Sequence, residues 1–294
     1  MSDWAIDLGG IVLRGVADEE PLSLPRALIF PGADPALMAR AAMLDPLSVD
    51  TATDSVLLRV QVFVIEAFGR TIIVDGGVGD DKERPARPSW HRRRTDFLAR
   101  LGVAPAAVTA MLFTHLHADH VGWATRLVDG RWVPTFPRAR HIVAAREFAH
   151  WAALDAVAPV GHGCFRDSVL PLVEAGLLDQ VADDHAPFPG MRFRPLPGHS
   201  PGQVGILLTG TRRRVLIAAD ALHHPAQLLA PALCSGFCTD AALAVATRQA
   251  LLDEAADDGL TLVPHHARSR ALWDITRRDG AFSLRGDDTN GPII

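Results

Sequence analysis

The sequence predicts a layered α/β fold, because β-rich runs alternate with helical patterns and the strongest runs end at polar residues. The 294 residues suffice for one large domain or two small ones, and a hydrophobic fraction of 48% supports a substantial buried core. No boundary is evident. We therefore expect a single domain over residues 1–294, with residues 1–50 packed on it as an N-terminal extension of irregular strands and loops.

The first strong elements form a predicted hairpin and a buried strand. From Ser55 the chain reads SVLLRVQVFVIEAFGRTIIVD, two β-rich runs that join across Phe68, Gly69 and Arg70. A helical pattern over residues 94–103 then ends at a glycine, and VTAMLF at 108–113 follows as a short apolar strand.

The second half of the chain repeats this pattern after a heterogeneous segment. Residues 124–190 contain the helical stretches AAREFAHWAALDAV and SVLPLVEAGLLDQVADD, which we expect to form a helical insert that roofs a site. Two further β-like runs flank Thr209-Gly210, and the second ends at Asp220. Asp240 is a candidate cap for the helix AALAVATRQALLDEAADDG, and LTLVPHH follows as a buried strand.

Charge and composition narrow the classes of partner. Lys and Arg number 29 against 34 Asp and Glu, a formal net charge of -5, which disfavours a nucleic-acid partner. No run approaches the roughly 20 apolar residues of a membrane helix, and MSDWAIDLGG lacks the layout of a signal peptide, so we expect a cytoplasmic protein without a membrane partner. The cysteines Cys164, Cys234 and Cys238 are expected to be reduced thiols.

The stretch FTHLHADHVGW at 113–123 carries the chemistry. In an extended segment alternate side chains point the same way, so His115 and His117 can bind one ion from a single loop. Asp119 and His120 face elsewhere and can bind a second ion. Two metals about 3.5–4 Å apart are the usual device for activating a water molecule between them.

Further ligands are expected at the ends of other strands, which converge on one edge of such folds. The candidates are His199 in the loop PGHSPGQ, Asp220, whose carboxylate can bridge two ions, and His265 or its neighbour His266. Strand alternation lets only one of these two histidines face the site. Asp75 either orients the histidine loop through hydrogen bonds or simply forms a turn before Gly76 and Gly77.

From about Ser55 to His266 the sequence resembles the metallo-β-lactamase superfamily. The resemblance rests on four features that occur in the order typical of the superfamily: H-x-H-x-D-H at 115–120, PGHSPG around His199, AAD ending at Asp220, and the late histidine. The resemblance implies an αββα sandwich, two mixed β-sheets flanked by helices. It also implies the ligands of two divalent ions, with zinc expected and iron, manganese or cobalt compatible. The implied ligands are His115, His117 and His199 at the first site, Asp119, His120 and His265 at the second, and a bridging Asp220; His266 is the alternative to His265.

Within the superfamily the sequence looks most like the lactonase and methyl parathion hydrolase branch. The implied reaction is attack by a metal-bridging hydroxide on a lactone or ester, or on a phosphotriester, with Asp119 as a proton shuttle. Acyl-homoserine lactonases carry a tyrosine three residues after the bridging aspartate, whereas this sequence has His223 there and no tyrosine at all. We expect His223 to donate a hydrogen bond to the developing oxyanion.

Two other activities are compatible with the motif: a mononuclear iron persulfide dioxygenase and a glyoxalase-II-like thioesterase. The expected partner is a small-molecule substrate, and relatives are often homodimers. His224 is interpreted as a pocket or a loop residue, and Trp123 as a pocket or a core residue. The basic run WHRRRTDF at 90–97 is interpreted as a solvated helix start, with contact to an anionic substrate as the alternative. Five histidines without a ligand pattern are interpreted as surface or packing residues: His91, His141, His150, His162 and His185.

Overall fold

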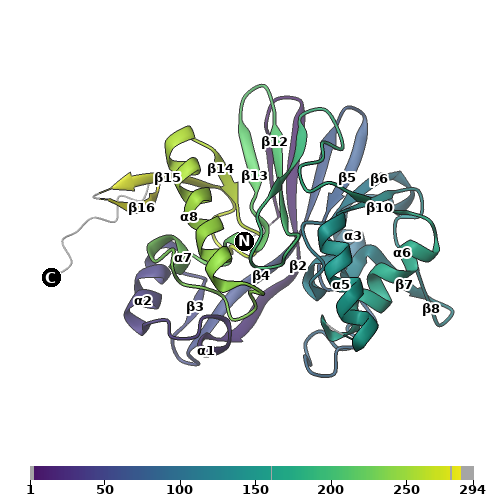
Figure 1. The fold of residues 1–294 in the computed structure, drawn as a ribbon, viewed down its shortest axis with the longest axis horizontal. Helices are drawn as coiled ribbons and strands as arrows, with labels where there is room; N and C mark the ends of the chain where they lie inside the picture. Colours follow the sequence, from purple (N-terminus) through teal and green to yellow (C-terminus); the bar gives the residue numbers. More distant parts are fainter. Residues whose placement is uncertain (1–2, 160, 279, 286–294) are drawn as a thin grey trace.

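The computed structural model describes residues 3–159, 161–278 and 280–285, which form two large β-sheets packed face to face (Figure 1). The first sheet has the strand order β1-β2-β4-β5-β6-β9-β10, with β3 paired to β4. Its strands are β1 (Trp4–Asp7), β2 (Ile11–Pro25), β3 (Val49–Asp50), β4 (Ser55–Ala67), β5 (Arg70–Val74), β6 (Val108–Leu112), β9 (Arg140–Ala144) and β10 (Leu178–Val181).

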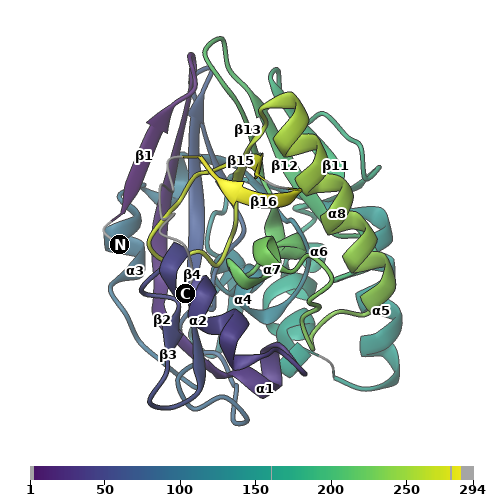
Figure 2. The same cartoon turned by 90° about the vertical axis from the view of Figure 1, so that its left-hand side faces the viewer.

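The second sheet runs in chain order from β11 to β16. Figure 2 shows β1, β2 and β4 on one side of the molecule and β11, β12 and β13 on the other. The strands of the second sheet are β11 (Met191–Pro195), β12 (Val204–Thr209), β13 (Arg214–Ile217), β14 (Thr261–Val263), β15 (Trp273–Arg278) and β16 (Ala281–Leu284). A separate two-stranded ribbon consists of β7 (Thr125–Val128) and β8 (Arg131–Pro134).

Both sheets are mixed. The predicted hairpin is confirmed, since β4 and β5 pair antiparallel, and β5, β6, β9 and β10 continue as parallel neighbours. In the second sheet β13 and β14 are parallel, and the other pairs are antiparallel. The hairpin turn uses Phe68 and Gly69 at φ 52° and 70°, the left-handed conformation that a tight turn of this kind requires.

Side chains of β4 alternate between two apolar cores. Val60, Val62 and Val64 pack outward beneath helices, whereas Phe63 and Ile65 pack inward against the second sheet. A third core lies between the second sheet and the longest helix. These layers confirm the αββα sandwich.

Helices cover the outer faces of both sheets (Figure 1). The helices are α1 (Arg26–Ile29), α2 (Pro35–Leu44), α3 (Phe97–Leu101), α4 (Ala118–Val121), α5 (Ala145–Val157), α6 (Leu170–Glu174), α7 (Ala226–Leu229) and α8 (Ala241–Asp258). The predicted caps of α8 are confirmed: Asp240 Oδ1 accepts the Leu243 N–H at 2.9 Å, and Gly259 ends the helix at φ 65°. None of the helices in the described residues combines the length and apolar character needed to cross a bilayer.

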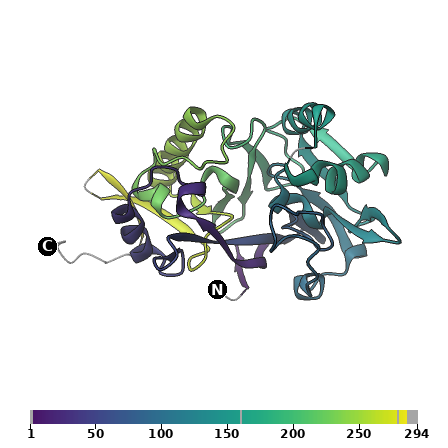
Figure 3. The ribbon, with the colours of Figure 1, turned by 90° about the horizontal axis from the view of Figure 1, so that it is seen from below.

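The N-terminal residues are more regular than their composition indicates. Strand β2 pairs with β4 from Ile11 to Pro25, so this segment belongs to the first sheet. The purple N-terminal helices then lie among the green and yellow elements of the C-terminal half (Figure 3), where α2 contacts α7. This placement brings residues 22–29 close to the late loops of the chain.

Residues 124–190 differ in part from the expected helical insert. The stretch AAREFAHWAALDAV forms α5, but SVLPLVEAGLLDQVADD contains the short helix α6 and then β10. Gly176 stops the helix at φ 65°, after which residues 178–181 pair in parallel with β9. Two strands of this segment, β9 and β10, therefore extend the first sheet.

Candidate metal centre

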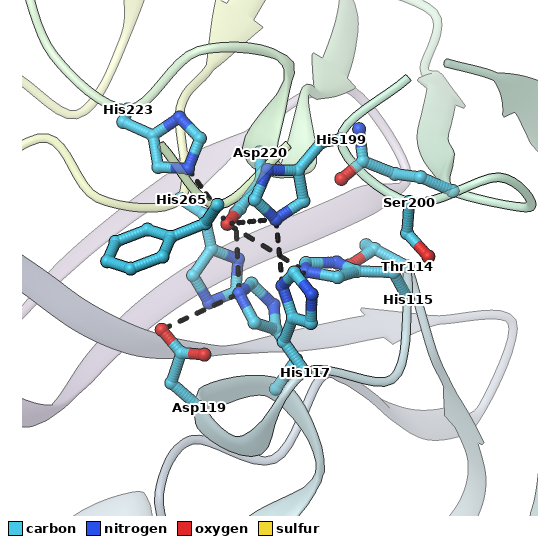
Figure 4. A network of polar contacts seen from close by, with 12 residues as sticks. Thr114, His115, His117, Asp119, His199, Ser200, Asp220, His223 and His265 are labelled. Atoms are coloured by element: carbon cyan, nitrogen blue, oxygen red, sulfur yellow. Dashed lines mark hydrogen bonds and ion pairs between the residues drawn. The ribbon is translucent and has the colours of Figure 1, made fainter. Parts of the chain in front are cut away.

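Asp75 and most of the predicted ligands lie in segments that follow four strands, and His199 lies in the loop after a fifth strand, β11. Asp75 follows β5, and the loop 113–117 follows β6. In the second sheet Asp220 follows β13, and residues 264–266 follow β14. Because β5 is parallel to β6 and β13 to β14, the loops within each pair leave the same edge of their sheet. Figure 4 shows the side chains from both sheets pointing toward one another.

The first cluster contains His115, His117, His199 and Asp220, whose ligand atoms all lie within 4.8 Å of one another. His199 Nε2 lies 2.8 Å from His117 Nδ1 and 3.2 Å from Asp220 Oδ2. His115 Nε2 lies 3.1 Å from His117 Nδ1. Ligand atoms at 2.0–2.1 Å from a tetrahedral zinc ion are about 3.3 Å apart, so these spacings fit a metal site.

The second cluster contains Asp119, His120 and His266. His120 Nε2 lies 3.3 Å from Asp220 Oδ1, and His266 Nε2 lies 3.2 Å from the same oxygen. Asp119 Oδ2 lies 3.8 Å from His266 Nε2. The two carboxylate oxygens of Asp220 therefore face different clusters of side chains.

His265, the histidine preferred from the sequence, lies apart from Asp119. Its Nδ1 is 3.5 Å from Asp75 Oδ2, and its ring packs edge-on against Phe63 with centroids 5.1 Å apart. His266 lies beside Asp119 and Asp220 instead, and its Nδ1 lies 2.8 Å from the carbonyl oxygen of Arg59. The strand β14 ends at Val263, so strict alternation no longer determines which of the two histidines faces the site.

The electrostatics of the site suit a cation. Burial lowers the pKa of His117 to about 4 and that of His115 and His199 well below the usual range, which keeps these imidazoles neutral and able to bind a metal. Burial also opposes charge on His120, but Asp220, Asp119 and Asp75 raise its pKa well above the usual value. These carboxylates thus attract positive charge.

Two facing atoms also lack well-formed partners. His120 Nε2 and Asp220 Oδ1 are buried without a good hydrogen bond, and an unpaired buried polar atom is costly. A divalent ion between these atoms would satisfy both. These two unpaired atoms are therefore evidence for a metal site that is independent of the sequence motif.

Asp75 orients both clusters, as one of the two interpretations of the sequence predicted. Its carboxylate accepts the Thr114 N–H at 2.8 Å and the Thr114 hydroxyl at 2.7 Å, and its Oδ2 lies 2.9 Å from His120 Nδ1. Thr114 Oγ1 in turn lies 3.1 Å from His115 Nδ1. Such outer contacts determine the tautomer and orientation of ligand histidines.

Glu147 of α5 is a supporting residue that the sequence analysis missed. Its buried carboxylate accepts the Leu116 N–H at 3.0 Å, the Trp151 indole N–H at 2.7 Å, the Ser200 hydroxyl at 2.6 Å and the Gly202 N–H at 3.0 Å. It thereby joins the loop of His115 and His117 to the loop of His199. A weak signal was present, because Glu147 and Trp151 are four residues apart and share a helix face.

The loop of His199 depends on tight backbone approaches and a sulfur contact. A Cβ at Gly202 would lie 2.2 Å from the backbone nitrogen of Glu147, so only glycine allows this packing. Cys238 Sγ lies 3.6 Å from His199 Nδ1, where a metal-ligating histidine usually meets a carboxylate or carbonyl. The three cysteines are free, as expected, but the contact with His199 was not predicted.

A cavity of about 220 Å³ opens onto both clusters. Asp119 and His223 line it as predicted, and His223 Nε2 lies 3.1 Å from Asp220 Oδ2. The His223 ring stacks on His266 with centroids 5.5 Å apart. Sequence analysis missed the apolar wall, which comes from the N-terminal elements, β4 and a late loop: Leu22, Leu24, Ile29, Leu58 and Phe237.

The structure gives the positions of several side chains for which the sequence allowed two interpretations. Trp123 is a core residue, stacked on Phe97 at 5.3 Å, and His224 is buried against Phe30 at 5.8 Å. His162, expected at the surface or in packing, lines the cavity. In the basic run, Arg92, Arg93 and Arg94 pair with Glu83, Asp18 and Asp81.

Residues 56–266 match the sequence profile of the metallo-β-lactamase superfamily. No curated protein sequence matches the chain.

Among solved structures, that of the hydrolase AbOPH in the β-lactamase superfamily is similar, with a TM-score of 0.78 at 19% identity and 96% of each chain covered. The structure of AidC, a dizinc quorum-quenching lactonase, gives a TM-score of 0.74 at 18% identity and 99% coverage of both chains. A probable metal-dependent hydrolase from Staphylococcus aureus gives 0.77 at 15% identity, with 96% of this chain and 99% of that chain covered. At these identities the likeness concerns the fold.

The profile match carries more weight, because it spans most of the chain and ends at the last histidine of the site. The chain belongs to the metallo-β-lactamase superfamily of metal-dependent hydrolases.

Proposed function

We propose that the protein is a dinuclear hydrolase that cleaves a lactone or an ester. The carboxylate of Asp220 carries this proposal, because its Oδ2 lies 3.2 Å from His199 Nε2 and its Oδ1 lies 3.2 Å from His266 Nε2. A carboxylate with one oxygen toward each cluster suits two ions better than one. The proposed ligands are His115, His117 and His199 for one ion, Asp119, His120 and His266 for the other, and Asp220 for both.

Zinc is the proposed metal, because imidazole and carboxylate donors suit it. Two such ions would lower the pKa of a water molecule to roughly 7 and polarise the carbonyl of the substrate. Asp119 is partly exposed at the cavity and lies beside His266, so it can accept a proton during the reaction. Asp220 contacts both groups of ligands and would hold them at a fixed spacing.

His223 is the proposed donor to the developing oxyanion. Its ring lines the cavity, and burial lowers its pKa, so the ring is neutral and carries one N–H. A single donor of this kind contributes about 10²–10³ in kcat where it has been removed from other enzymes. The variant His223→Phe should lose activity on this scale while it retains its metal.

The apolar wall of the cavity supports a substrate with an aliphatic or aromatic portion. AidC is described as a quorum-quenching lactonase, and AiiA from B. thuringiensis was solved with N-decanoyl-L-homoserine bound, which makes lactones the first compounds to test. A phosphotriester also needs its electrophilic phosphorus to be polarised, so phosphotriesters are the second class of compound to test. The ligands of a second ion favour this reading over a mononuclear iron dioxygenase.

The test is hydrolysis of a panel by the zinc-loaded protein: an aliphatic lactone, an aryl ester, a phosphotriester, a thioester and a β-lactam. We expect lactone or ester turnover that is lost in Asp220→Ala and reduced about 10²–10³-fold in His223→Phe. Turnover of none of these compounds, or turnover that survives in Asp220→Ala, would contradict the proposal. Loss of zinc from His223→Phe would instead make His223 a ligand.

A further inference from the structure

Arg87 is the one lysine or arginine among the described residues that line the catalytic cavity. Its guanidinium carbon lies over the Trp90 ring, 4.8 Å from the ring centre, which is a cation–π contact. A cation–π contact leaves N–H groups of the guanidinium free, and these are the groups that recognise an oxyanion.

The other cations of this segment already have carboxylate partners. Lys82 and Arg84 pair with Asp167, and Arg92, Arg93 and Arg94 pair with acids of their own. In the described part of the chain, Arg87 makes no ion pair within 4.0 Å. Arg87 is thus a partly exposed cation on the cavity lining whose charge is not taken up by a carboxylate within ion-pair distance.

The position of Arg87 is well defined by its surroundings. The Arg87 N–H donates to the carbonyl of Arg84 at 2.8 Å, and the Trp90 N–H donates to the carbonyl of Arg87 at 2.9 Å. Arg84 is fully buried, and its guanidinium makes two bonds to the Asp167 carboxylate at 2.6 and 2.9 Å. The Trp90 ring is buried, and its indole N–H donates to Glu19. The guanidinium therefore sits on a turn that is held at several points.

The same cavity reaches from Arg87 to the two clusters. His162 also lines this cavity, and burial together with the positive charges of Arg84 and Arg87 lowers its pKa, against the opposing charge of Asp119. Asp119, His162 and Arg87 all line this one cavity. A substrate whose carbonyl meets the metal site can therefore extend its other end toward Arg87.

We propose that Arg87 binds a carboxylate of the substrate at a distance from the bond that is cleaved. The substrate class is then an ester or lactone with a negatively charged end and an aliphatic middle that lies against the apolar wall of the cavity. This inference rests on the proposed hydrolase function and adds the charge of the substrate. It assigns to Arg87 the anion contact for which the sequence had offered the neighbouring basic run.

The test compares two esters of equal chain length on the zinc-loaded protein, 4-nitrophenyl hexanoate and the mono-4-nitrophenyl ester of adipic acid. The wild type should prefer the adipate ester. In Arg87→Gln the ratio of kcat/KM for the adipate ester over the hexanoate ester should fall about 10- to 100-fold, chiefly through KM, because a hydrogen-bonded charge pair is lost. Arg87→Lys should retain part of the preference.

Arg94→Gln is the matched control, since Arg94 lies in the same segment, pairs with Asp81 at 2.8 Å and is exposed outside the cavity. It should leave the ratio unchanged. No preference for the adipate ester in the wild type, or an unchanged ratio in Arg87→Gln, would overturn the proposal.

Binding of the two acids, measured by calorimetry, separates this proposal from the hydrolase function. Adipate should bind the zinc-loaded wild type at least about tenfold tighter than hexanoate, and Arg87→Gln should remove this difference. If neither ester is cleaved but adipate keeps its advantage, the hydrolase proposal fails and the anion site stands. If hexanoate ester is cleaved without any advantage for adipate, only the role of Arg87 fails.

Discussion

The two adjacent histidines at the end of β14 have different surroundings. His266 Nε2 faces Asp220 and Asp119, whereas His265 packs against Phe63 and faces Asp75. A ligand contributes its lone pair directly to the metal, while a neighbour of a ligand acts only by orienting it. The two residues should therefore respond differently to the same substitution.

We expect His266→Gln to lose about one zinc ion per chain, because the second cluster keeps only Asp119, His120 and one oxygen of Asp220. His265→Gln should retain both ions, with an affinity lowered by no more than the roughly 10- to 100-fold typical of outer contacts. Zinc titration against a chelator measures both. Normal zinc binding by His266→Gln together with loss in His265→Gln would reverse the assignment.

Individual site residues differ in how well their sequence predicts them. His115, His117, Asp119 and His120 follow from their spacing, because one short segment, a loop that leads into α4, presents them all. The choice between His265 and His266 depends on a backbone that has already left the strand. Cys238, Glu147 and Arg87 reach the site only through tertiary packing, and only Glu147 has even a weak local signal, its i, i+4 spacing to Trp151.

At the scale of elements, helix α5 holds two ligand loops together through one side chain. Glu147 accepts N–H groups of Leu116 and Gly202 and the hydroxyl of Ser200, all in loops that carry proposed metal ligands. Hydrogen bonds to a buried carboxylate are charge-assisted and stronger than neutral ones. The helix therefore stabilises the site as well as the core.

Glu147→Gln should lower the free energy of unfolding by about 1.5–3 kcal/mol, because an amide NH₂ would face donors that now meet a carboxylate oxygen. Glu174→Gln, at an exposed position of α6, is the control and should change it by less than about 0.5 kcal/mol. Urea denaturation of both variants gives the comparison. Equal stabilities of the two variants would refute the bridging role of Glu147.

Elements were predictable where local signals agree. The hairpin of β4 and β5 and the capped helix α8 combine a clear period with turn or cap residues. β10 was hidden because LLDQV continues an apolar helical pattern, and only pairing with β9 makes it a strand. β2 was obscured by the prolines and glycines of the first 50 residues, although it pairs along most of β4.

At the scale of the whole molecule, the sandwich depends on buried groups that are neutral in the folded state. His141 is fully buried at the start of β9 and stacks on Phe113 with centroids 6.2 Å apart. Burial lowers its pKa to about 4, whereas an unfolded chain has a value near 6.5. Below about pH 6.5 the unfolded state therefore binds a proton that the folded state does not bind, and the free energy of unfolding falls until about pH 4.

His141→Leu should remove this contribution. Its unfolding free energy should fall between pH 7 and pH 5 by about 2 kcal/mol less than that of the wild type, as the shift of one such group requires. Both proteins keep every proposed ligand, so loss of metal in acid affects them equally. Denaturation curves at the two pH values test this, and an identical fall in both proteins would exclude His141 as a source of acid sensitivity.

The overall architecture followed from the ordered motifs, but the substrate cavity did not. Its wall combines β2, α1 and β4 with residues 161–162, His223 and Phe237, and these segments meet where α2 packs on α7. Contacts between segments so far apart in the chain leave no periodic signal. Substrate preference is thus a property of the assembled molecule.

The central claim is that Asp220 bridges two metal ions, and the metal content of the zinc-loaded protein tests it most directly. Elemental analysis after removal of loosely bound zinc should give about two ions per chain in the wild type and fewer in Asp220→Ala. One ion per chain in the wild type, or two ions retained in Asp220→Ala, would contradict the claim.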